Sequence, residues 1–111
     1  MILKLKKKKK PTIESIESLK ISVRSLDKND IESRKLPKGT TGLVIVDIKK
    51  DSPINYLNIN NIIVEAKKRK IKSAKDLKKI IDETIKSKEK TILIAIYNNQ
   101  NQRRYIGIKL D

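Results

Sequence analysis

The apolar residues of this chain come in short runs of mostly β-branched side chains, and this pattern constrains the fold most. Residues 43–48 (LVIVDI) and 91–97 (TILIAIY) are almost continuously apolar, as expected of buried strands. Aromatic residues are limited to three tyrosines, so isoleucine has to fill the core, and its branched side chain favours strands. The 111 residues suffice for one domain of this kind.

Three further segments have the pattern of strands. Residues 19–26 begin with strict alternation of apolar and polar side chains, which predicts a half-buried strand. Residues 62–66 form a short apolar run, and residues 104–110 alternate after the polar turn NNQNQ. Together with the two continuous runs, these segments predict about five strands.

One segment, residues 73–87, has the pattern of an amphipathic helix. Four apolar residues recur at helical spacing while lysine and acidic residues fill most other positions. These four are Leu77, Ile80, Ile81 and Ile85. Ser73 and Asp76 have the spacing of a helix-capping pair. The sequence therefore predicts one long helix with its apolar side against the strands.

Two shorter helical turns are also expected. Asp30 can cap one of them within the polar residues 27–35. Pro53 suits the first turn of the other, which then begins with Asp51 or Ser52 as its N-cap. The fold class is therefore α+β, with about five strands, one long helix and one or two short helices.

The chain divides into a basic tail and a domain. Residues 1–11 contain a run of lysines, which repel one another, and we expect this tail to be disordered. Residues 12–111 form the expected domain. No apolar run approaches the roughly 20 residues that a membrane helix needs, and the first residues lack the pattern of a secretory signal.

The formal net charge of +15 is expected to attract polyanions in a salt-dependent way. Besides the tail, one basic patch is predicted at an exposed turn, and it consists of Lys67, Lys68, Arg69 and Lys70. The patch can bind nucleic acid or anionic lipid, or it can be a solvated turn. The lysine content is also what an AT-rich genome tends to encode. Three scattered tyrosines make a poor stacking platform for single-stranded nucleic acid.

The composition argues against most catalytic chemistry. The chain has no cysteine and no histidine, so it lacks thiolate ligands, the commonest zinc ligand and the commonest general base. Its serines and carboxylates have no partners at catalytic spacing, and the serine-protease nucleophile motifs are absent. We therefore expect no catalytic residues, no cofactor and no metal site in this chain alone.

In the order of its elements the chain resembles a PDZ domain, and most of all the circularly permuted C-terminal PDZ domain of bacterial HtrA/Deg serine proteases. The matching stretches are TGLVIVDI (41–48), DSPI (51–54), NNII (60–63), SAKDLKKII (73–81), TILIAIY (91–97) and RRYIGIKL (103–110). Asn60 and Asn61 replace the family's usual Gly-Asp pair, and the basic residues 67–70 replace its Asn-Gly turn. The resemblance implies a small, partly open β-barrel or sandwich.

The resemblance also implies a peptide-binding groove between the first strand and the long helix. A ligand would add as a strand along residues 21–26. The groove residues it implies are Leu19, Lys20, Ile21, Ser22, Val23, Leu77 and Ile81. Lys20 stands where the family's carboxylate-binding loop carries glycine, and it either hinders that loop or supplies a charge. The alternative is that the apolar members of this set are simply core residues.

The function implied by the resemblance is that of a non-catalytic polypeptide-binding PDZ module. It would be part of an HtrA/Deg-like serine endopeptidase in protein quality control, at the cell envelope or periplasm. Its expected partners are C-termini or extended segments of unfolded proteins, and other protomers of such an assembly. The alternative, from the charge, is a small basic nucleic-acid-binding protein. For the PDZ module, we expect nucleic-acid binding to be weak and non-specific.

Overall fold

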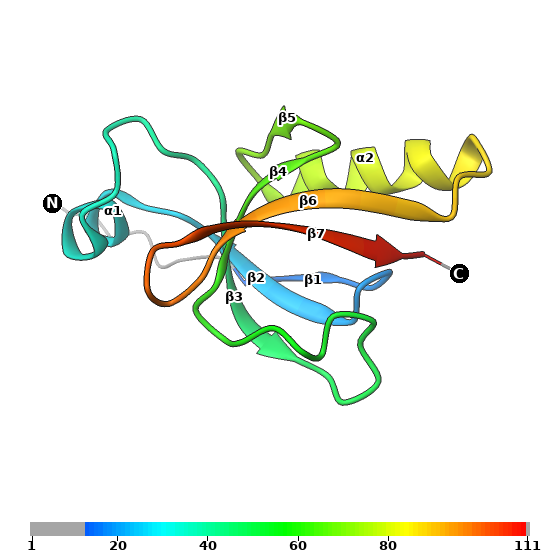
Figure 1. Cartoon of the computed structure of the whole chain (residues 1–111), viewed down its shortest axis with the longest axis horizontal. Coiled ribbons are helices and arrows are strands. Elements are labelled where there is room, and N and C mark those ends of the chain that lie inside the picture. Colours follow the sequence, from blue (N-terminus) through cyan, green and yellow to red (C-terminus); the bar gives the residue numbers. More distant parts are fainter. Residues whose placement is uncertain (1–12, 111) are drawn as a thin grey trace, which may run out of the picture.

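The computed structural model describes residues 13–110, which form seven antiparallel strands in one open sheet and two helices (Figure 1). In chain order these are β1 (Glu14–Ile16), β2 (Ile21–Ser25), α1 (Lys28–Arg34), β3 (Leu43–Ile48), β4 (Ile62–Ala66), β5 (Arg69–Lys70), α2 (Ala74–Lys86), β6 (Thr91–Tyr97) and β7 (Arg103–Lys109). The strand order is β1-β2-β3-β4-β6-β7, and β5 pairs with β4. The predicted α+β class is confirmed. The PDZ assignment stays a prediction, as does the basic tail, which lies outside the described residues.

The strand count was predicted too low, because β1 and β5 are too short to show a pattern. β1 has three residues and β5 has two, whereas alternation needs at least four to be recognised. A two-residue turn at Lys67 and Lys68, with φ of 52° and 66°, joins β4 to β5. The basic segment 67–70 is thus half turn and half strand.

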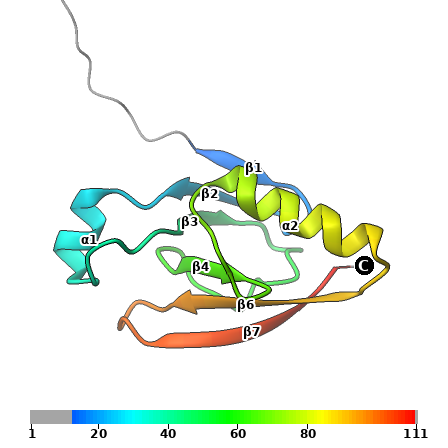
Figure 2. The same ribbon diagram turned by 90° about the horizontal axis from the view of Figure 1, so that it is seen from above.

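Helix α2 covers one face of the sheet and contacts β1, β2 and β6. Figure 2 shows α2 alongside β1, while β7 forms the other end of the sheet. The main hydrophobic core lies beneath the helix and is built almost entirely from isoleucine, leucine and valine. A smaller cluster, of Leu36, Val44, Ile62, Val64 and Ala95, lies apart from this core, with Ile31 of α1 packed against it.

The start of α2 is as predicted, but its apolar face differs at one residue. Ser73 is the N-cap, and its Oγ accepts a hydrogen bond from the backbone N of Asp76. Ile85 is 47% exposed, whereas Thr84 is buried and its hydroxyl donates to the carbonyl of Ile80 at 2.8 Å. At about 100° per residue, Thr84 lies only ~20° from Leu77 around the helix axis and Ile85 lies ~80° away. The prediction for Ile85 was therefore wrong.

Of the two short helices predicted, only the first forms. The N-cap of α1 is Asp27 rather than Asp30, which instead completes the capping box at the third helical position. Residues 53–56 form two separate turns, closed by hydrogen bonds from Asn55 N to Ser52 O and from Leu57 N to Ile54 O, and no helix. Ser52 is not a helix cap, because no helix follows it.

Neither helix within residues 13–110 is long and apolar enough to cross a membrane.

Two glycines allow a matched test of packing. A Cβ at Gly42 would lie 2.6 Å from the carbonyl oxygen of Ile63, whereas a Cβ at Gly107 would meet nothing within 4 Å. Gly42→Ala should therefore lower the free energy of unfolding by about 1–3 kcal/mol, the usual cost of overpacking. Gly107→Ala should leave it nearly unchanged. Urea denaturation of both variants checks this, and equal midpoints would contradict the packing described.

The ion pair that joins β2 to α1 predicts a pH dependence. Two hydrogen bonds from Arg24, at 2.7 and 2.8 Å, lower the pKa of Asp30 from 3.8 to about 2. Since the pKa is lower in the folded state, this stabilisation is complete above about pH 4 and is lost as the pH falls toward 2. Asp30→Asn should cost on the order of 1–2 kcal/mol at neutral pH and reduce the stability loss in that window.

Urea denaturation at several pH values would measure this effect, with Asp82→Asn on the exposed side of α2 as the control. An Asp30→Asn variant with the wild-type pH profile would contradict the proposed role of the pair.

Candidate functional site

The apolar residues predicted to line a groove are brought together between β2 and α2, but they are buried. Leu19, Ile21 and Val23 meet Leu77 and Ile81 of the helix in the main core. All five are at most 2% exposed. Of the two polar members of the predicted set, Lys20 is exposed and Ser22 is half-buried.

The reason for this burial is that β1 covers the edge of β2. Glu14, Ser15 and Ile16 pair antiparallel with Val23, Ser22 and Ile21, respectively. A ligand was expected to add as a strand along residues 21–26, but in the structure residues 21–23 are already paired with β1. The sequence signal for β1 was weak, because one buried isoleucine in a three-residue strand makes no pattern.

Ile16 is the residue that closes the groove. Its side chain is 1% exposed and belongs to the same core cluster as Ile21 and Ile81. Glu14, two residues earlier, lies at the surface with its carboxylate 3.7 Å from the ammonium of Lys78 on α2. A shallow hollow of about 340 Å³ remains between the end of β1 and the middle of α2.

In the turn from β1 to β2, two backbone N–H groups donate hydrogen bonds to carbonyl groups at the start of the same turn. The N–H of Leu19 donates to the carbonyl of Ile16 at 3.1 Å, and that of Lys20 donates to Glu17 at 3.2 Å. Lys20 has a φ of 54°, in the left-handed region that favours glycine. Lysine thus stands at a position with a glycine-like conformation, at the site where the resemblance expects glycine.

The side chain of Lys20 is also engaged. Its Nζ donates to Asp51 at 2.6 Å, and this hydrogen bond lowers the pKa of the Asp51 carboxyl. Both side chains are largely exposed, so the pair contributes little to stability. It does orient the ammonium toward Asp51, which lies in the DSPI segment.

Ser52 holds the same turn from beneath. Its buried hydroxyl donates to the carbonyl of Leu19 at 2.6 Å and accepts from the N–H of Ile54 at 3.0 Å. The DSPI segment therefore fixes the start of β2, while Ile54 is fully buried in the core. This role could not be read from the sequence, because Leu19 lies 33 residues away from Ser52.

The basic patch is partly neutralised by ion pairs. Lys67 contacts Glu89 at 2.7 Å, and Arg69 contacts Glu83 at 2.6 Å. The hydrogen bond from Arg69 lowers the pKa of Glu83. Nucleic-acid binding by a folded surface needs a continuous basic face, and the patch gives that function less support than the net charge alone suggests.

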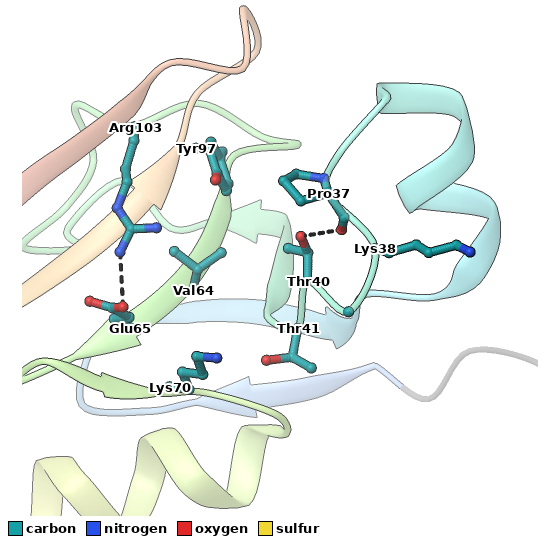
Figure 3. A pocket seen from close by; sticks show the side chains of 10 residues that line it. Pro37, Lys38, Thr40, Thr41, Val64, Glu65, Lys70, Tyr97 and Arg103 are labelled. Atoms are coloured by element: carbon teal, nitrogen blue, oxygen red, sulfur yellow. Dashed lines mark hydrogen bonds and ion pairs between the residues drawn. The ribbon is translucent and has the colours of Figure 1, made fainter.

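A second hollow, of about 230 Å³, lies between the 37–41 loop and the ends of β4, β6 and β7 (Figure 3). Arg103 stands at its edge, 2.9 Å from Glu65, and its guanidinium lies 6.0 and 5.6 Å from the rings of Tyr97 and Tyr105. Hydrogen bonds to Tyr105, Glu65 and Tyr97 raise its pKa. The guanidinium of Arg103 is thus bound by side chains of β4, β6 and β7, and it is not directed at a ligand.

Comparison with protein-family models and with curated proteins finds no match for this chain. Any assignment of function therefore rests on the residues and geometry described above.

Removing the Ser52 hydroxyl should loosen the turn before β2. Ser52→Ala leaves the Leu19 carbonyl and the Ile54 N–H without their partner, which should cost on the order of 1–3 kcal/mol. Ser18→Ala, in the exposed part of the same turn, should change the free energy of unfolding by less than about 0.5 kcal/mol. Thermal denaturation compares the two, and equally stable variants would show that the hydroxyl does not anchor the turn.

Proposed function

We propose that this domain is a non-catalytic polypeptide-binding module of the PDZ type, which holds an extended segment between β2 and α2. One observation carries the proposal: this site already holds an extended segment. β1 pairs antiparallel with β2, and one of its side chains is buried among Ile21, Leu77 and Ile81. Strand addition of this kind is a general mode of peptide recognition.

The order of the elements supports the same proposal. After β2 come β3, the DSPI segment, β4, a tight turn, α2 and then two paired strands, which is the order expected from the resemblance. The left-handed conformation of Lys20 also fits a loop that carries glycine in the resembled domains. Both points concern the backbone, and they hold whether or not β1 fills the groove.

As a wider setting, we propose that the module serves an HtrA/Deg-like serine endopeptidase in protein quality control at the cell envelope. Its partners would be C-termini or extended segments of unfolded proteins, or other protomers of such an assembly. Since this chain has no histidine, a Ser-His-Asp centre would have to be supplied from outside the sequence given. Binding of nucleic acid would be weak and non-specific, and would depend on charge.

Chemical-shift mapping tests the function. The ¹⁵N-labelled full chain would be titrated with a peptide that ends in isoleucine, and the amide shifts should change along residues 19–23 and 77–81. We expect a dissociation constant on the order of 100 μM or weaker, since the peptide must be ordered and must compete with β1. The matched control is the same peptide with its last isoleucine replaced by serine.

Shifts confined to residues 67–70, or equal binding of the control peptide, would contradict polypeptide recognition at this site.

A further inference from the structure

We propose that β1 is a built-in ligand of the groove, and that external ligands carry the same pattern and bind by displacing it. The pattern is an acidic residue two positions before an aliphatic one, as in Glu14-Ser15-Ile16. This inference rests on the proposed function and adds to it both a ligand class and a means of control. It follows from three features of the β1 strand.

The first feature is the way in which β1 is held. Its backbone pairs with residues 21–23 of β2, and the carbonyl of its last residue, Ile16, accepts a hydrogen bond from the N–H of Leu19. Ile16 is almost fully buried beside α2. β1 therefore makes the main-chain and apolar contacts that an added strand would make.

The second feature is charge. In a strand, residues two apart point to the same side, so Glu14 and Ile16 both face α2. The carboxylate of Glu14 lies 3.7 Å from the ammonium of Lys78 on α2. Asp82, one turn further along, faces the far end of the strand. The groove next to Glu14 thus carries the ammonium of Lys78, which favours an acidic residue at that position of any occupant.

The third feature is how little holds β1 in place. It is a three-residue strand at one end of the sheet, so its outer side pairs with no other strand among the described residues. The ion pair between Glu14 and Lys78 is long, and both side chains are exposed, so this pair contributes little. When a ligand displaces β1, the main contact that is lost is the burial of Ile16. An aliphatic side chain of the ligand can be buried in its place.

A disulfide that locks β1 onto β2 tests the inference. Ser15 and Ser22 are direct cross-strand partners, within the Cα separation that a disulfide accepts, and the chain has no cysteine of its own. The double variant Ser15→Cys/Ser22→Cys would be titrated with the peptide Thr-Ile-Glu-Ser-Ile, the sequence of residues 12–16. We expect the oxidised monomer to lose at least ~10-fold in affinity, and reduction to restore it.

The matched control is a disulfide of the same kind elsewhere. Thr91 and Lys109 are exposed cross-strand partners in β6 and β7. The double variant Thr91→Cys/Lys109→Cys should bind the peptide equally well when oxidised and when reduced. A loss of affinity in this control as well would mean that rigidity of the sheet, and not β1, governs binding, and would overturn the inference.

Weakening β1 should have the opposite effect. Glu14→Lys places a like charge beside Lys78 without touching the core, and it should raise the affinity for the peptide about two- to fivefold. Glu32→Lys, an equal charge change at an exposed position of α1, should leave the affinity unchanged. A peptide with lysine in place of glutamate should bind the wild-type chain more weakly than Thr-Ile-Glu-Ser-Ile does.

The outcomes separate the inference from the function. The peptide could change the amide shifts of residues 19–23 and 77–81 equally in the oxidised and reduced forms of Ser15→Cys/Ser22→Cys. In that case the groove binds peptides but β1 does not block it, and the inference is overturned. If lysine and glutamate peptides bind equally, the proposed ligand class is overturned. If no variant binds at these residues, the proposed function fails and the inference falls with it.

Discussion

The contact between the apolar side of α2 and the strands beneath it is the interaction on which the rest of this structure depends. The sheet is open, with β1 and β7 at its two ends, and α2 is the element that contacts β1, β2 and β6 together. Leu77 and Ile81 are buried at this contact. Because no aromatic side chain belongs to the main core, the fit depends on many small branched groups, each of which contributes a similar amount.

The same contact determines what the candidate site can do. A helix that packs over one end of a sheet leaves a slot beside the nearest strand, and an apolar side chain must fill it. Here Ile16 of β1 fills it. The groove and the core are therefore one continuous apolar region, which is why the five apolar residues predicted as groove lining are also core residues. The two interpretations of those residues are compatible.

Elements with a recognisable pattern within a short stretch of sequence were predicted. Elements defined only by contacts with distant residues were missed. β3, β6 and α2 were predicted nearly to the residue, because continuous apolar runs and a Ser73 cap are visible within a short window. β1 was missed because only its partner strand and α2 define it. The role of Ser52 depends on Leu19, far away in the sequence, and no local pattern could indicate it. The residues predicted as groove lining do lie together, but they are buried in the core and β1 covers the edge of β2.

The departures from the resembled pattern have a common backbone explanation. Three of them fall at residues with positive φ: Lys20 before β2, Asn60 before β4, and the Lys67–Lys68 turn after β4. The resembled domains have glycine at or beside each of these places. Left-handed conformations cost non-glycine residues on the order of 1 kcal/mol each, and asparagine less. At these places the chain has a left-handed backbone of the kind that glycine favours, with lysine or asparagine side chains.

At these positions the backbone conformation does not depend on having glycine as the residue. Substituting lysine for glycine adds charge and a small conformational cost, but it leaves the path of the chain unchanged. At Lys20 the added ammonium is paired with Asp51, and at Lys67 it is paired with Glu89. Part of the lysine content is therefore located at turns with a left-handed backbone, where its charge is locally compensated.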